Sequence, residues 1–100
     1  MLIVAGTLDV DPGQRDQFLE GRRDGVVATR AEPGCLEYAF SADLVKPGRV
    51  RVFERWESKD TLARHLEALG RAARSGGPGI EILARELVQY EISGSGPLGS

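Results

Sequence analysis

One hundred residues are enough for one domain and leave no room for a second hydrophobic core. The composition is that of an ordinary globular protein, with 41% hydrophobic and 28% charged residues, and a net charge of −2 excludes the basic surface typical of nucleic-acid-binding proteins. No run approaches the roughly 18 consecutive apolar residues of a membrane span.

The first predicted elements are a strand and a long helix. Residues 2–10 alternate like a strand, but both of its faces are mostly apolar, so neither face is suited to water. Asp11-Pro12 is a helix start, with Asp as the N-cap and Pro at the first helical position. The helix is expected to run to about Ala31 and to bury Phe18, Leu19, Val26 and Val27. Pro33-Gly34 ends it.

Two further strands and a second helix follow. Residues 35–42 predict a strand with Leu36, Tyr38, Phe40 and Ala42 on one face. After a turn at 46–48, residues 49–57 predict another strand, on which Val50, Val52, Glu54 and Trp56 share a face. Ser58 is the N-cap of a helix expected to bury Leu62, Leu66 and Leu69, which are spaced four and three residues apart.

The remainder predicts a Gly-rich loop over 71–78, room for a short helical turn over 80–84, and a last strand over 87–92. The order β-α-β-β-α-β is that of a ferredoxin-like α+β fold with a four-stranded antiparallel sheet. The domain is therefore assigned to residues 1–92. Residues 93–100 (SGSGPLGS) have almost nothing to bury, so we interpret them as a flexible tail of native or artificial origin.

Two motifs resemble a known family. Glu-Pro-Gly-Cys-Leu-x-Tyr at 32–38 and Glu-x-Trp-x-Ser-x-x-x-Leu-x-x-His at 54–65 are similar to the antibiotic biosynthesis monooxygenase domain. The resemblance implies a homodimer in which two sheets pack face to face as a dimeric α/β barrel. It also implies cofactor-independent oxidation of a phenolic, anthrone or quinol-type substrate to a quinone. Some members degrade haem with the help of an Asn, but this chain contains no Asn.

His65, Trp56 and Tyr38 are the candidate site residues. His65 is the predicted catalytic base because its unperturbed pKa near 6.5 suits proton transfer at neutral pH; the structural alternative is a helix histidine bonded to a Glu or a carbonyl. Trp56 and Tyr38 are assigned to substrate binding, against the alternative that both fill the core. Glu54 shares the face of Trp56 and must be paired or have a raised pKa, so it is interpreted as structural. Glu32 is expected only to finish the helix.

Metals and thiol chemistry are not expected. One His and one Cys provide no plausible zinc or iron site, so no cofactor is predicted. Cys35 is expected to point away from Tyr38 and to behave as a small buried hydrophobe. With a single Cys, no internal disulfide and no basic leader before the first strand, a cytoplasmic protein is expected.

Together with this resemblance, the sequence predicts a cytoplasmic homodimer, without nucleic-acid or membrane partners, that uses dioxygen to oxidise a small hydrophobic aromatic substrate. Two alternatives stay open. One is an isomerase or lyase acting on a small metabolite, which predicts several Arg or Lys converging in the pocket. The other is a non-catalytic ligand-binding module, which predicts that His65 points to solvent or into a sealed core.

Overall fold

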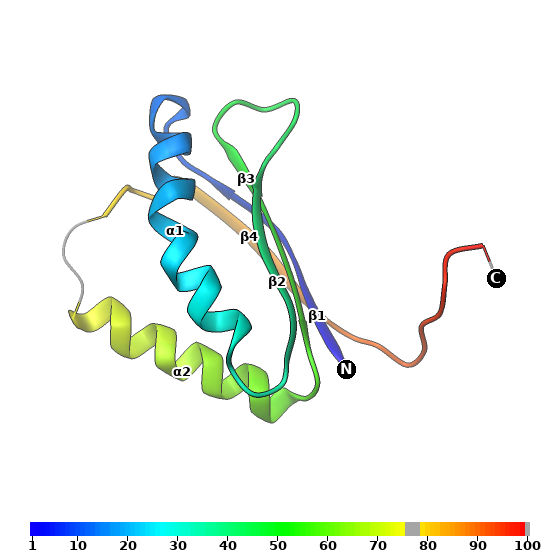
Figure 1. The fold of residues 1–100 in the computed structure, drawn as a ribbon. Coiled ribbons are helices and arrows are strands. Elements are labelled where there is room, and N and C mark those ends of the chain that lie inside the picture. The colour runs from blue at the N-terminus through cyan, green and yellow to red at the C-terminus, as the bar shows by residue number, and fades with distance from the viewer. Residues whose placement is uncertain (76–78, 100) are drawn as a thin grey trace.

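The fold is a four-stranded antiparallel sheet with both helices on one of its faces (Figure 1). The computed structural model describes residues 1–75 and 79–99, and it describes 72–75 by their backbone alone. The strands are β1 (Leu2–Asp9), β2 (Cys35–Ala42), β3 (Arg49–Trp56) and β4 (Ala84–Glu91), in the spatial order β2-β3-β1-β4. This topology confirms the predicted ferredoxin-like α+β fold.

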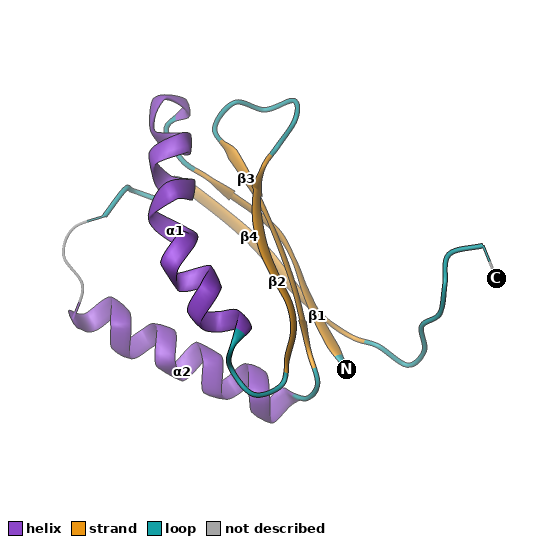
Figure 2. Cartoon of the chain, viewed as in Figure 1, coloured by secondary structure: helices purple, strands orange, loops and turns teal. Residues whose placement is uncertain are grey.

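Side-chain caps start the 3₁₀ turn before α1 and start α2. Asp11 accepts a hydrogen bond from the Gly13 N–H at 2.8 Å and starts a 3₁₀ turn (Pro12–Gln14), which leads into α1 (Arg15–Arg30). The Ser58 hydroxyl accepts from the Thr61 N–H at 3.2 Å and caps α2 (Lys59–Ser75), as predicted. Figure 2 shows the two helices crossing the same face of the sheet.

Several predicted boundaries are wrong at the C-terminal end. Arg71–Ser75 belong to α2 instead of the loop, whereas 76–78 lie outside the described residues. Residues 80–83 form no helical turn, and β4 begins at Ala84 instead of Leu87. The reason lies in pairing: Ala84, Arg85 and Glu86 stand opposite residues 9, 8 and 7 of β1, and the ladder of hydrogen bonds extends the strand beyond its apolar part.

The core between helices and sheet has two parts. Phe18 of α1 packs with Leu8, Val10, Val50 and Val52 near one end of the sheet. At the other end Trp56 packs with its partners Leu2, Tyr38 and Leu62. Val27, which was predicted to be buried, is 65% exposed, because α1 presents only one stripe of residues to the sheet.

Among the described residues, no helix lies on the second face of the sheet (Figure 1). Because side chains alternate along a strand, this outer face includes Ile3, Ala5 and Phe53, together with Val88 and Tyr90, which are 42% and 49% exposed. Residues 93–99 run away from the sheet (Figure 1). In the described part of the chain, no helix is both long and apolar enough to cross a membrane.

We expect Gly34→Ala to destabilise the domain. Gly34 has a φ of 84°, and a Cβ there would overlap the Thr61 side chain at the start of α2. The backbone strain alone should lower the free energy of unfolding by about 1–3 kcal/mol. Urea denaturation measures this change. Gly21→Ala is the control, because nothing lies within 4 Å of a Cβ there, and it should raise stability by up to ~1 kcal/mol. Equal stability of the two variants would contradict this account.

Candidate functional site

A groove of about 860 Å³ lies between the sheet and the helices. Its walls are mainly apolar side chains from the sheet and from α2, and α1 contributes Phe18 and Arg22. The apolar lining includes Val4, Leu8, Phe40, Val52, Leu62, Leu66, Leu69, Ile82 and Leu87. A cavity of this size and polarity is typical of a site for a small hydrophobic molecule.

The groove exists because α2 is not packed down along its whole length. Leu62 is buried, as predicted, but Leu66 and Leu69 are 55% and 42% exposed and line the groove instead of filling the core. All eight residues of β4 are exposed, so the sheet beneath this part of α2 is open. The prediction that Leu66 and Leu69 are buried is therefore wrong, and these side chains form the apolar wall.

Glu54 is the carboxylic acid in the lining of the groove. It lies on β3 opposite Val4 on one side and Tyr38 on the other, and only 7% of it is exposed. Its Oε1 accepts a hydrogen bond of 3.0 Å from the Trp56 indole N–H. Burial raises the pKa of Glu54, and the bond from Trp56 opposes this increase only in part. A carboxylate in such a setting is a stronger base than an exposed one.

Tyr38 stands beside Glu54 in the same wall. Burial, together with the nearby Glu54 charge, raises the pKa of Tyr38 to about 12. The phenol therefore keeps its proton at neutral pH and can donate a hydrogen bond. Within the described residues, no partner of the Tyr38 hydroxyl is found, so it is available to a bound molecule.

Trp56 and His65 lie behind this wall. Trp56 is fully buried and His65 is 1% exposed, with their ring centroids 4.8 Å apart and the planes inclined by 31°. The His65 ring also meets the edge of Tyr38, at a centroid distance of 5.2 Å. The three predicted site residues are thus brought together, but of the three only Tyr38 lines the groove.

Glu32 holds His65 in place. The Glu32 carboxylate lies 2.9 Å from His65 Nδ1, so this nitrogen donates to it, and Nε2 is left as the second ring nitrogen. Nε2 is buried and has no hydrogen-bond partner in the described part of the chain. The expectation that Glu32 only finishes α1 is therefore wrong. The enclosed ring matches the structural alternative for His65, a helix histidine bonded to a Glu.

The contacts that two acidic residues make around the site were not predicted from the sequence. Glu54 was correctly expected, from its place in an apolar row, to be paired or to have a raised pKa, but it was interpreted as structural and not as part of a groove. Glu32 had no comparable signal, because its contact with His65 joins residues 33 positions apart. Arg22 and Arg85, which also line the groove, were not singled out by any motif.

The Cys35 side chain points to the face of the sheet opposite to the one predicted. A bulge between Cys35 and Glu37 shifts the register of β2, so Cys35 packs with Tyr38 and Trp56 on the helix-facing side. Burial raises the pKa of the Cys35 thiol, which makes it a poor nucleophile. Over residues 1–75 and 79–99, no group of three or more His, Cys, Asp or Glu is arranged to hold a metal ion.

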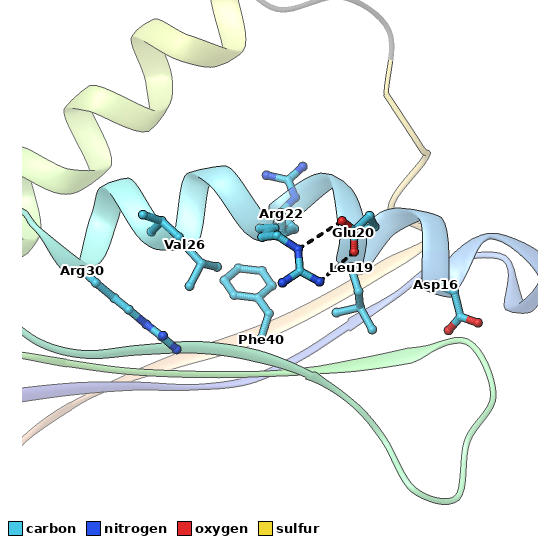
Figure 3. A pocket seen from close by; sticks show the side chains of 9 residues that line it. Asp16, Leu19, Glu20, Arg22, Val26, Arg30 and Phe40 are labelled. Carbon is cyan, nitrogen blue, oxygen red and sulfur yellow. Dashed lines mark hydrogen bonds and ion pairs between the residues drawn. The ribbon is translucent and has the colours of Figure 1, made fainter.

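A second hollow of about 380 Å³ lies between α1 and the edge strand β2 (Figure 3). Its lining includes Asp16, Arg30 and an exposed ion pair between Glu20 and Arg23, at 2.9 Å. Figure 3 shows Asp16, Glu20 and Arg30 spread along α1. Neither Glu54 nor Tyr38 lines this hollow. We therefore take the larger groove as the candidate site.

Comparison with known proteins agrees with this fold. The family model described as antibiotic biosynthesis monooxygenase matches residues 1–71. An uncharacterised protein of Synechocystis is 29% identical over 66 residues, which are 66% of this chain. The chain spans 45% of the length of that curated relative.

Solved structures with the same fold cover nearly the whole chain. A proposed antibiotic biosynthesis monooxygenase of Deinococcus radiodurans has a TM-score of 0.74 and 24% identity, with 100% of both chains covered. One from Chloroflexus aurantiacus has a TM-score of 0.66 and 25% identity, with 98% of each chain covered. The haem degrader MhuD of Mycobacterium tuberculosis has a TM-score of 0.74 at 16% identity, covering 97% of this chain and 100% of its own.

We expect Glu54→Gln to change how stability depends on pH. Because the pKa of Glu54 is raised in the folded state, its contribution to stability is fully present below the ordinary glutamate pKa and is lost as pH rises through the folded value. Glutamine keeps an acceptor for Trp56 without this loss. The difference in unfolding free energy, wild type minus variant, should therefore fall with rising pH, by about 1.4 kcal/mol per unit of pKa shift. A difference that rises with pH in urea titrations would contradict the assignment.

Proposed function

Since the chain belongs to the antibiotic biosynthesis monooxygenase family, we propose that it is a cofactor-independent monooxygenase that oxidises a hydrophobic phenolic, anthrone or quinol-type substrate to a quinone. The observation that carries the proposal is the Glu54 carboxyl, 7% exposed in the wall of an apolar groove. Such a groove binds an aromatic ring system, and the raised pKa of Glu54 suits it to accept a proton from carbon or oxygen.

The reaction needs a base and a donor, and it needs no external reductant. For an anthrone, the base removes a proton from the ring CH₂ group, and the negative charge is delocalised through the aromatic system onto the carbonyl oxygen across the central ring. The anion gives one electron to dioxygen, and the two radicals join through a new C–O bond to form a hydroperoxide. Loss of water then gives the quinone C=O, so one oxygen atom enters the product and the other leaves as water.

Glu54 and Tyr38 provide these two groups in the proposal. Glu54 removes the proton, and Tyr38, whose pKa of about 12 keeps its hydroxyl protonated, donates to the oxygen on which charge develops. Both side chains face the groove from adjacent strands, opposite one another in the β2–β3 register. A substrate ring lying against this wall would contact both groups.

His65 takes a supporting role in this mechanism. Its ring fills the space behind Tyr38 and Trp56, and its bond to Glu32 ties α2 to the end of α1. Trp56 in turn orients Glu54 through its N–H. His65 and Trp56 are therefore positioning residues, and the role of base, predicted for His65 from the sequence, is proposed for Glu54.

Oxygen-dependent turnover tests the proposal. We expect wild type to convert anthrone to anthraquinone in air and not under nitrogen, and Glu54→Gln to lose about 10²- to 10⁴-fold in kcat, the usual contribution of a general base. Glu37→Gln is the matched control, because Glu37 pairs with Arg55 at 2.9 Å on the outer face. Full activity in Glu54→Gln, or a loss confined to His65→Asn, would overturn the assignment of the base.

A non-catalytic binding module is the second candidate, because the enclosure of His65 removes from the groove the side chain whose ordinary pKa lies nearest neutrality. Binding of anthraquinone by wild type, without oxygen consumption from anthrone or a quinol, would favour it. Turnover that does not need oxygen would instead favour the isomerase or lyase alternative.

We also propose that a second copy of the chain covers the outer face of the sheet. This face exposes Val88 and Tyr90 beside Phe53, and a patch of this kind on a small domain is typical of a protein interface. A cytoplasmic location is part of the same proposal, in keeping with the free thiol of Cys35.

Ala5→Arg should convert the dimer to a monomer. Ala5 lies at the centre of the outer face, between Phe53 and Val88, so an arginine there would place an unpaired charge in the interface without entering the core. Light scattering after gel filtration measures the mass. Val27→Arg, on the exposed side of α1, is the control and should leave the dimer intact. A wild type that is monomeric at all concentrations would refute the dimer.

A further inference from the structure

The groove is lined by two arginines in addition to Glu54 and Tyr38. Arg22 of α1 and Arg85 of β4 both line it, together with the aliphatic and aromatic side chains already described. Arg85 faces the helices, because it pairs with Leu8, whose side chain belongs to the buried core on that face. Arg22 lies over the Phe18 ring, with its guanidinium carbon 4.9 Å from the ring centroid.

Arg85 and the Phe18 ring beneath Arg22 lie toward the same end of the sheet. Phe18, beneath Arg22, packs in the core cluster of Leu8 and Val50, and Leu8 stands directly opposite Arg85. Glu54 is instead opposite Val4, four residues away along β1. At about 3.3 Å per residue, the level of Arg85 and the level of Glu54 are roughly 13 Å apart along the strands. A polycyclic molecule lying along the groove would therefore reach from one level to the other.

Neither arginine has a carboxylate partner in the described part of the chain. Other arginines on the sheet do: Arg49 pairs with Asp9, Arg51 with Asp43 and Arg55 with Glu37, at 2.8–2.9 Å. Residues 72–78 contain no Asp or Glu, so they offer no such partner either. Two guanidinium groups that line an apolar groove without a counter-ion are suited to bind an anion, and Arg forms paired hydrogen bonds with carboxylates.

We propose that the substrate of this groove carries an anionic group, which binds between Arg22 and Arg85 while its reacting ring lies against Glu54 and Tyr38. This inference rests on the proposed function and adds the substrate class, an acidic aromatic. The charges also orient the molecule. The anion is attracted to the arginine end and repelled by the Glu54 carboxylate, so the uncharged ring is directed to the base.

Binding in the absence of turnover tests the inference separately from the oxidation. The probes are anthraquinone-2-carboxylate, anthraquinone-2-sulfonate and the neutral 2-hydroxymethylanthraquinone, measured by calorimetry with the full chain. We expect wild type to bind the carboxylate at least about 10-fold more tightly than the neutral probe, in line with a charge-assisted hydrogen bond. The sulfonate shows whether any anion suffices or a carboxylate is preferred, and binding of either anion above the neutral probe supports the inference.

Arg22→Gln and Arg85→Gln should each reduce or remove this preference while leaving binding of the neutral probe within about twofold. Arg64→Gln is the matched control, since Arg64 is an exposed arginine of α2 that does not line the groove. Equal binding of charged and neutral probes by wild type, or an equal loss in Arg64→Gln, would overturn the inference. If a neutral anthrone is oxidised but the acid is not preferred, the proposed function stands and this inference fails. If the acid is preferred but no anthrone is oxidised, the anion site stands and the proposed oxidation fails.

Discussion

A buried carboxylate held by one indole N–H is the interaction on which the site depends. Glu54 costs free energy when it is ionised in the low-dielectric groove, and its hydrogen bond from Trp56 offsets only part of that cost. Trp56 is in turn fixed by the His65 ring, and His65 by Glu32 at the end of α1. The chain of contacts joins both helices to the sheet at the point where chemistry is proposed.

The groove itself follows from incomplete packing. This small domain has two core clusters, both on the helix-covered side of the sheet. Because α2 does not cover β4, that edge of the sheet is exposed. Leu66 and Leu69 therefore line a cavity instead of closing it. The Glu54 carboxyl and the Tyr38 phenol lie at one level of this cavity, and Arg85 lies toward another. The same opening thus explains a hydrophobic site and the separation of charge within it.

Much of the fold could be predicted from the sequence, because strand alternation, the Asp11 and Ser58 caps and the Pro33-Gly34 stop are local signals. Tyr38, Trp56 and His65 were singled out from the sequence, and the structure brings their rings into contact. Local signals fail where long-range contacts decide. The bulge after Cys35 turns its side chain to the other face of the sheet, and pairing with β1 makes β4 longer than its apolar part. The contact between Glu32 and His65 depends on how α1 and α2 pack against each other. The burial of Glu54 could be inferred from its apolar row, but its place in the wall of a groove could not.

The central claim is that Glu54, and not His65, removes the substrate proton. The most direct measurement is anaerobic stopped-flow absorbance of anthrone mixed with the enzyme, where proton removal forms the coloured anion and no oxygen is present to consume it. We predict rapid formation of the anion by wild type and by His65→Asn, which keeps a donor for Glu32, and none above the background rate by Glu54→Gln. Anion formation by Glu54→Gln at the wild-type rate, or its loss only in His65→Asn, would contradict the account.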